Sequence, residues 1–307
     1  MKILLIADRP GWAYDTLAQS IKKHSIYPSI EIQYISDLRL NPDSANLSDF
    51  DVVFFFLWYD AMRYGMKIKG FDFRKTCVGI HSISSWKNRG LNENQTSLIC
   101  NQFAACGYIS QEIGGLLDPK NGFYTPNGVE RVIFFPFEYP EFNQELRLMW
   151  VGNPGRAHHG ENKAFFHLVK PVIEEYSDRG VKLLVATHEQ KIDHSEMGKF
   201  YRANHVLICA SLFEGGPLPV IESLACGRPV VSTNVGIVPE VITNGENGFI
   251  FARTRTGLRQ IIEMLLANPS KLSSMASKCA DSVSDRFSES MAKSYDSMFK
   301  FVFESSR

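Results

Sequence analysis

The segment over residues 211–231 combines a glycine pair, prolines and two carboxylates directly after a buried strand pattern. Gly215 and Gly216 let the backbone approach a ligand without side-chain hindrance. Pro219 suits the first turn of a helix, and Gly227 suits its end. The pattern predicts a glycine loop that leads from the carboxyl end of a strand into a short helix. The free N–H groups at the N-terminus of such a helix suit an anion such as phosphate.

The two carboxylates, Glu214 and Glu222, lie in the predicted loop and about one turn inside the predicted helix. We expect both to face one ligand, with Glu214 near the reacting end. A carboxylate accepts two hydrogen bonds in one plane, which fits the vicinal hydroxyls of a sugar or a ribose. The alternative is that Glu222 is a solvated helix residue and the glycine pair only a turn. A Glu222 carboxylate covered by other side chains would contradict the ligand-binding interpretation.

Apolar runs of strand length alternate with helix-length stretches along the chain, which is typical of an α/β protein with parallel sheets. The predicted strands are Ile3–Ala7, Ile30–Ile35, Val52–Trp58, Cys77–His81, Cys106–Ile109, Leu146–Val151, Val181–Thr187, His205–Ala210, Pro229–Thr233 and Gly248–Phe251. The predicted helices include Trp12–Lys23, Lys163–Tyr176, Gly257–Ala267 and an amphipathic helix over Met291–Phe303. A segment rich in proline, glycine and aromatic residues over 119–145 predicts the connection between two domains, over residues 1–135 and 136–285, followed by a helix over 286–307.

The composition restricts the class of protein. The 307 residues carry 33 basic and 33 acidic side chains, so bulk positive charge does not support nucleic-acid binding. The longest apolar run, Val52–Trp58, is far shorter than the ~20 residues of a membrane helix. With no leader pattern at the N-terminus, we expect a cytoplasmic chain. The six cysteines form no Cys-x-x-Cys pair, so we expect neither disulfides nor zinc.

The segment resembles the donor-site signature of retaining GT-B glycosyltransferases of family four, the glycosyl transferases group 1. The matching residues are Glu214-Gly215, Glu222-Ser223 and Ala225-Cys226-Gly227-Arg228-Pro229-Val230-Val231. The likeness continues over Val235 to Ile242 and Asn244 to Ile250, and it includes Tyr124 to Glu130. The resemblance implies two Rossmann-like domains with parallel sheets facing each other across a cleft. The first would bind the acceptor, the second the nucleotide-sugar donor, and the last helix would pack back on the first domain.

The family needs no metal, and it neutralises the leaving diphosphate with an arginine and a lysine after the first strand of the second domain. Lys163 matches that lysine, whereas Asn153 stands at the usual arginine position and Arg156 is displaced by three residues. The resemblance implies that both cations would donate charge-assisted hydrogen bonds to the diphosphate. Arg156 as an exposed loop residue is the alternative. No metal site is expected at His158-His159.

Two positions in the first domain also match the family. His81 ends a predicted strand, where the family places a histidine that faces the donor sugar and the acceptor. Gly11 follows the first strand, where the family has a glycine turn against the diphosphate. The resemblance therefore implies catalytic roles for His81 and Glu214. Donor binding would involve Gly11, Arg156, Lys163, Gly215, Gly216, Pro217, Leu218 and Glu222. A structural histidine at the strand end and an ordinary strand-to-helix turn are the alternatives.

The implied activity is a retaining, metal-independent transfer of a sugar from a nucleotide-diphosphate-sugar to an acceptor hydroxyl, without a cofactor. The segment after Thr187 is shorter than the family's, so the donor remains open between a UDP-sugar and a GDP-sugar. A glycan, a lipid-linked molecule and a protein remain open as acceptors, and peripheral contact at the inner membrane face is an alternative location. Other functions are a non-catalytic nucleotide-sugar-binding protein, a partner subunit of another transferase, and a sugar-nucleotide epimerase.

Overall fold

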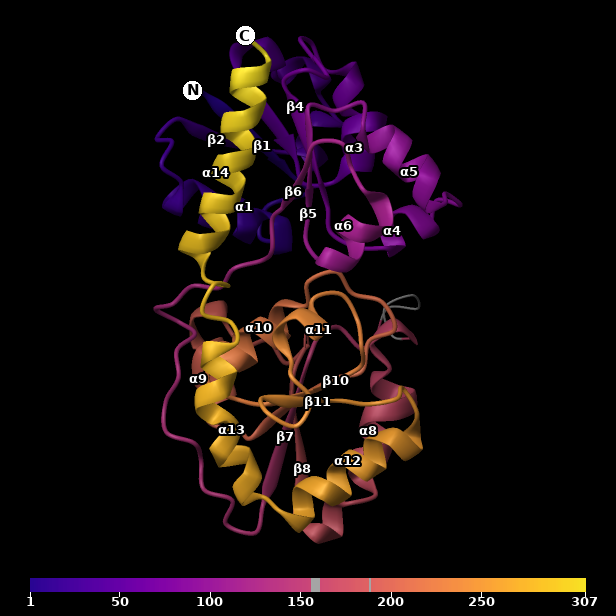
Figure 1. Cartoon of the computed structure of the whole chain (residues 1–307), viewed down its shortest axis with the longest axis vertical. Helices are drawn as coiled ribbons and strands as arrows, with labels where there is room; N and C mark the ends of the chain where they lie inside the picture. The colour runs from indigo at the N-terminus through magenta and orange to yellow at the C-terminus, as the bar shows by residue number, and fades with distance from the viewer. Residues whose placement is uncertain (156–160, 188) are drawn as a thin grey trace. The chain divides into compact units, whose positions relative to one another are not determined.

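The computed structural model describes residues 1–155, 161–187 and 189–307, which form two compact units (Figure 1). Unit 1 consists of Met1–Gly128 together with Ser288–Arg307, and unit 2 consists of Val129–Phe287. The predicted boundaries at 135/136 and 285/286 fall a few residues from these positions. Each unit is built on its own parallel sheet, and the two are described separately below.

Unit 1 has a six-stranded parallel sheet in the order β2-β1-β3-β4-β5-β6. Its central strands are buried on both faces, which explains their nearly continuous runs of apolar residues. The strands are β1 Ile3–Ala7, β2 Ile30–Tyr34, β3 Val52–Phe55, β4 Thr76–Ile80, β5 Ala105–Tyr108 and β6 Gly122–Tyr124. The helices are α1 Ala13–His24, α2 Ile35–Leu38, α3 Trp58–Arg63, α4 Ser84–Lys87, α5 Glu93–Cys100, α6 Gln111–Leu117 and α14 Ser288–Ser305.

The last helix, α14, belongs to unit 1 and lies beside α1 (Figure 1). Tyr295 and Phe299 on its buried face meet the Phe54 ring of β3 edge-on, at centroid distances of 5.4 and 6.0 Å. Met298 and Val302 are buried in the same cluster. The amphipathic pattern is thus satisfied inside the protein, and this apolar face offers no support for membrane contact.

Unit 2 has a five-stranded parallel sheet in the order β11-β10-β9-β7-β8. Its strands are β7 Leu146–Val151, β8 Val181–Ala186, β9 Val206–Cys209, β10 Val230–Ser232 and β11 Gly248–Ile250. Its helices are α8 Lys170–Glu174, α9 His194–Arg202, α10 Leu218–Ala225, α11 Val238–Val241, α12 Arg255–Ala267 and α13 Ser270–Asp281. The carboxyl ends of the strands, where open parallel sheets bind ligands, therefore carry the loops after β7, β8 and β9.

All ten predicted strands are confirmed, with ends that differ by at most three residues. The structure adds β6, Gly122–Tyr124, inside the segment predicted to be a connection. The helical stretch predicted over Lys163–Tyr176 is confirmed in part, as a π-helical turn followed directly by α8. Ala164 adopts a left-handed backbone with φ of +56°, which breaks the helix before a π-helical turn over Phe165–Val169.

A fully buried arginine fixes the extended segment that precedes β7. Arg228 Nη1 donates to Phe137 O at 3.2 Å, and its Nη2 donates to Glu138 O and Arg202 O, both at 2.8 Å. Backbone carbonyls thus satisfy both terminal nitrogens of a buried cation, whereas its Nε has no hydrogen-bond partner among the described residues. In the family signature this position is variable, so the sequence alone gave no sign of this role.

Candidate active site

The loop after β9 has the predicted form. It leaves the sheet at Cys209 and enters α10 at Leu218, with Pro219 in the first turn of that helix. Gly227, just beyond the helix end, has φ of +71°, a left-handed conformation that favours glycine. The loop therefore lies at the carboxyl edge of the unit 2 sheet, as the sequence predicted.

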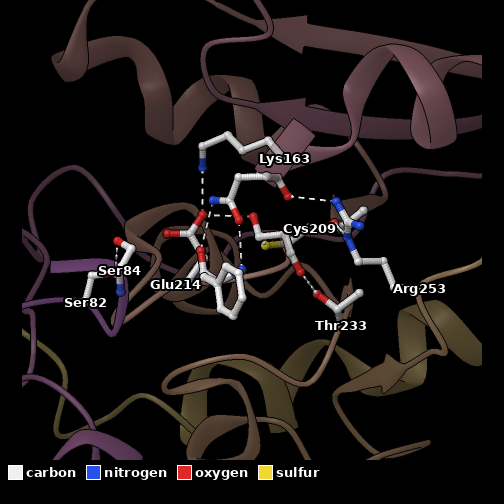
Figure 2. Close-up of polar contacts among 11 residues, drawn as sticks. Ser82, Ser84, Lys163, Cys209, Glu214, Thr233 and Arg253 are labelled. Atoms are coloured by element: carbon white, nitrogen blue, oxygen red, sulfur yellow. Dashed lines mark hydrogen bonds and ion pairs between the residues drawn. The ribbon is translucent and has the colours of Figure 1, made fainter. Parts of the chain in front are cut away.

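Glu214 in this loop forms an ion pair with Lys163 (Figure 2). Lys163 Nζ lies 2.9 Å from Glu214 Oε1, and the Ser211 hydroxyl donates to the same oxygen at 2.8 Å. The two charged side chains are 23% and 19% exposed, so a ligand can still reach them. Burial opposes the charged amine, but the Glu214 carboxylate outweighs it and holds the pKa of Lys163 above its usual range. Residues 51 positions apart, both predicted from the sequence, thus share one site.

Three residues that the sequence analysis missed hold the backbone of this loop. The Asn162 side chain donates to Phe213 O at 2.9 Å, and its carbonyl oxygen accepts from Phe213 N at 2.8 Å. Thr233 donates to Ser211 O, and Arg253 Nε donates to Ala210 O at 2.9 Å (Figure 2). These contacts link the loop to distant elements. The only feature of the sequence that could have pointed to any of the three is that Asn162 is next to Lys163.

Gly215 and Gly216 differ in their surroundings. Gly215 is buried and its carbonyl accepts from Ile237 N at 3.0 Å, whereas Gly216 is half-buried. Gly236, next to Ile237, has φ of +52°, and a Cβ there would collide with the Gly215 carbonyl. Pro217 is buried and Leu218 is half-buried. The backbone of Gly215 thus lies very close to that of Gly236. Contact of Gly215 and Gly216 with a donor stays a prediction.

Glu222 lies in α10 as predicted, but its carboxylate is covered. The residue is 7% exposed, and its Oε2 accepts a hydrogen bond from the Tyr201 hydroxyl at 2.7 Å. Burial raises the pKa of Glu222 to about 7, although the Tyr201 hydrogen bond favours the charged form. This contradicts the expectation that Glu222 presents an open carboxylate beside Glu214. A role in binding ribose stays a prediction that requires Tyr201 to move or to share the carboxylate.

We expect Glu222→Gln to gain stability relative to the wild type as the pH rises. The folded-state pKa of about 7 exceeds the ordinary value of 4.5, so the folded wild type binds the extra proton and loses stability between pH 4.5 and pH 8. The variant lacks this titration, and the difference should reach about 1–3 kcal/mol between pH 5 and pH 8.5. Urea unfolding at both pH values measures it. Glu196→Gln, on the exposed face of α9, is the control. The prediction would be contradicted if the free energy of unfolding of Glu222→Gln, relative to the wild type, were the same at both pH values.

His81 follows β4 in unit 1 and is buried against Tyr14 and Phe56, with ring centroids at 4.9 and 6.0 Å. Gly79 makes room for it, because a Cβ there would lie 2.5 Å from His81 Nε2. Burial lowers the pKa of His81 to about 4, against a smaller opposing effect of the Phe56 carbonyl. Neither ring nitrogen meets hydrogen-bond geometry with a described protein atom. A neutral imidazole is therefore held at the carboxyl end of β4 with unused polar atoms.

Gly11 lies in the turn before α1, with φ of +73°, and its N–H donates to Asp15 Oδ2 at 2.7 Å. No atom lies within 4 Å of a Cβ built there, so its backbone conformation alone accounts for the glycine. Arg156 and the two histidines after it lie outside the described residues. Across the described residues, no group of three or more His, Cys, Asp and Glu side chains is placed to hold a metal ion. No helix in the same part of the chain has the length and apolarity to cross a bilayer.

The whole chain superposes on solved proteins with the same two-unit architecture. It covers 99% of sucrose-phosphate synthase from Thermosynechococcus elongatus and is itself covered to 99%, with a TM-score of 0.74 and 15% identity. It covers all of the Anabaena protein HepE, solved with UDP, and is covered to 98%, with a TM-score of 0.65 and 13% identity. These likenesses establish the GT-B fold. In addition, residues 186–281 match the family described as glycosyl transferases group 1. This match covers less than a third of the chain and lies entirely within unit 2, so it is a resemblance of that unit to the family.

Curated relatives align over part of the chain. D-inositol 3-phosphate glycosyltransferase of Rhodococcus opacus is 32% identical over 136 residues, which are 43% of this chain and 28% of that protein. Trehalose synthase of Pyrococcus horikoshii is 27% identical over 123 residues, which are 40% of this chain and 28% of that protein. The chain thus spans less than a third of the length of these relatives. The group 1 match includes Glu214 and Glu222 and excludes Lys163.

Proposed function

We propose that this protein is a retaining, metal-independent glycosyltransferase of group 1 that moves a sugar from a nucleotide-diphosphate-sugar to an acceptor hydroxyl. The observation that carries the proposal is the Lys163–Glu214 pair at the carboxyl edge of the unit 2 sheet, next to the segment that matches the family. Crystal structures of the similarly folded HepE with UDP and with UDP-glucose support a nucleotide-sugar as the donor.

In this proposal unit 2 binds the donor. Lys163 donates charge-assisted hydrogen bonds to the diphosphate, which gains negative charge as the bond to the sugar breaks. Glu214 accepts hydrogen bonds from hydroxyls of the donor sugar. The acceptor oxygen forms a bond to the anomeric carbon on the face that the diphosphate leaves, and the acceptor proton passes to the departing diphosphate oxygen. No separate base is needed. A cytoplasmic setting, at or near the inner membrane face, is part of the same proposal.

The proposal is tested by incubating the full chain with labelled UDP- and GDP-sugars and analysing the products. We expect slow hydrolysis of one donor without an acceptor, and retention of the anomeric configuration in the product. A donor that binds tightly to the wild type without hydrolysis or transfer would reject the enzyme and favour a nucleotide-sugar-binding protein. Interconversion of the donor sugar without release of the nucleotide would indicate an epimerase. Activity that survives chelation supports metal independence.

A second candidate, the non-catalytic nucleotide-sugar-binding protein, is favoured by Asn153 at the position of the family arginine and by the single Gly11 after the first strand. Such a protein needs affinity for the donor but no stabilisation of charge on a leaving group. Glu214→Gln separates the two. It should lower turnover and affinity in an enzyme, whereas a binding protein would show a change in affinity with no turnover in either form.

We expect His81→Leu to lower kcat about 10-fold while the affinity for UDP stays the same, because one hydrogen bond to a sugar hydroxyl is lost. Leucine keeps most of the volume among Tyr14 and Phe56. Since burial holds the pKa of His81 at about 4, kcat should show no inflection from this residue between pH 5 and pH 8. A pH–rate profile of both proteins checks this. A wild-type inflection near pH 6.5 that disappears in the variant would contradict it.

A further inference from the structure

Unit 1 contains a cavity of about 560 Å³ at the carboxyl ends of its first three strands. Asp8 and Arg9 follow β1, Ser36 follows β2, and Asp60 lies in α3 just after β3. The full lining is Asp8, Arg9, Ile35, Ser36, Arg39, Leu40, Leu57, Tyr59, Asp60, Arg63 and Tyr64. The carboxyl ends of parallel strands are where open α/β sheets bind ligands, and nothing described so far occupies this position.

Three arginines surround the cavity, and their guanidinium groups rest on aromatic rings. Arg9 lies 4.0 Å from the centre of the Trp12 ring, and Arg39 and Arg63 lie 5.4 and 5.2 Å from the centre of the Tyr64 ring. Among the described residues, no carboxylate lies within 4.0 Å of any of these three guanidinium groups. A guanidinium stacked on a ring keeps its in-plane N–H donors free, so the cavity offers several donors to an anion.

Two carboxylates lie deeper in the same cavity. Asp8 Oδ1 is buried and has no hydrogen-bond partner among the described residues. Asp60 is half-buried, and burial raises its pKa to about 6, although Arg89, Arg39 and Arg63 favour its charged form. A buried carboxylate oxygen without a partner is costly unless a ligand donates to it, and hydroxyl groups are suitable donors.

We propose that this cavity binds the acceptor, and that the acceptor carries a phosphate or carboxylate group next to free hydroxyls. Arg9, Arg39 and Arg63 would bind the anionic group, and Asp8 and Asp60 would accept hydrogen bonds from the hydroxyls. A neutral sugar would leave the arginines unpaired, and a cation would meet them as like charges. The role as acceptor site rests on the proposed transferase function; the anion-binding chemistry rests on unit 1 alone.

Binding is measured on the full chain by isothermal titration with glucose 6-phosphate, with glucose, and with inorganic phosphate. We expect glucose 6-phosphate to bind at least 10-fold more tightly than glucose. The double substitution Arg39→Gln with Arg63→Gln should weaken glucose 6-phosphate binding about 10- to 100-fold, since charge-assisted hydrogen bonds are lost. Arg74→Gln, an exposed arginine of unit 1 that pairs with Asp72, is the matched control and should bind as the wild type does.

Asp60→Asn tests the hydroxyl contacts separately. It should lower the affinity for glucose 6-phosphate while inorganic phosphate binds as before, because only the sugar supplies hydroxyl donors. Vesicles of phosphatidylcholine with and without phosphatidylglycerol distinguish the source of the anion. Binding to the anionic vesicles that depends on Arg39 and Arg63 supports a lipid headgroup; binding to the soluble sugar phosphate alone supports a free sugar phosphate.

Equal affinity for glucose and glucose 6-phosphate, or equal losses in the arginine pair and in Arg74→Gln, would overturn the proposal. Lys163→Ala separates it from the proposed function, because this unit 2 variant should lower UDP affinity and leave glucose 6-phosphate affinity unchanged. If Lys163→Ala abolishes binding of both UDP and glucose 6-phosphate, the donor site binds the anion and the proposal fails. The protein could bind glucose 6-phosphate through these arginines and yet turn over no nucleotide-sugar. That result would support the anion-binding site and contradict the proposed transferase function.

Discussion

Replacing Lys163 with alanine is expected to lower kcat/KM for donor turnover about 10²- to 10³-fold. The amine lies 2.9 Å from Glu214, in the loop predicted to contact the diphosphate. Its loss removes stabilisation of the charge that develops on the leaving group, and it also leaves Glu214 without its ion pair. Steady-state kinetics with the donor that the wild type uses would measure the effect.

The control for Lys163→Ala is Lys199→Ala, on the exposed face of α9, where the amine pairs with Glu196. Its kcat/KM should equal that of the wild type. The interpretation requires that Lys163→Ala lowers kcat as well as donor affinity, because Lys163 is proposed to bind the diphosphate in the ground state and more strongly in the transition state. A variant that loses affinity alone, with kcat intact, would show that Lys163 only binds the donor.

Gly236→Ala is expected to cost about 2–4 kcal/mol of stability and to lower turnover about 100-fold. A Cβ at this position collides with the Gly215 carbonyl, which is backbone and cannot rotate away. The loop that carries Glu214 must therefore shift, and a shift of about 1 Å in a positioning element typically costs about 10²-fold in rate. Urea unfolding and steady-state kinetics would be compared on the same preparation.

Gly245→Ala is a matched control for this substitution. Gly245 also has a left-handed backbone, with φ of +83°, but a Cβ there meets no atom within 4 Å. It should cost only the left-handed penalty of about 1–2 kcal/mol and leave turnover unchanged. Equal losses of activity in the two variants would show that backbone conformation, rather than contact with Gly215, explains the effect.

Sequence patterns predicted the fold well wherever a local pattern carries the information. The apolar runs located ten strands, and the turn chemistry of Pro219 and Gly227 placed α10 correctly. The strand β6 was missed because it has three residues inside a segment dominated by turn formers. The break at Ala164 was missed because alanine is a strong helix former, so nothing local indicates a left-handed residue there.

The site was predicted less completely, because its contacts join residues far apart in the chain. The sequence predicted Glu214 and Lys163 as site residues. It could not predict that they form an ion pair, because 51 positions separate them. The covering of Glu222 depends on Tyr201, a residue of another helix, and no periodicity reveals it. Because the Glu222 carboxylate is covered, the assignment rests on the family match over residues 186–281 and on the Lys163–Glu214 pair.

Unit 1 is formed by two separate stretches of the chain, and this affects the order in which its parts are synthesised. Residues 1–128 leave the ribosome before α14 exists, so the sheet face around Phe54 lacks its Tyr295 and Phe299 cover while unit 2 is being made. Unit 2 is continuous, and it has all of its residues once Phe287 has emerged. The sheet of unit 1 can therefore receive its last helix only after all of unit 2 has been synthesised.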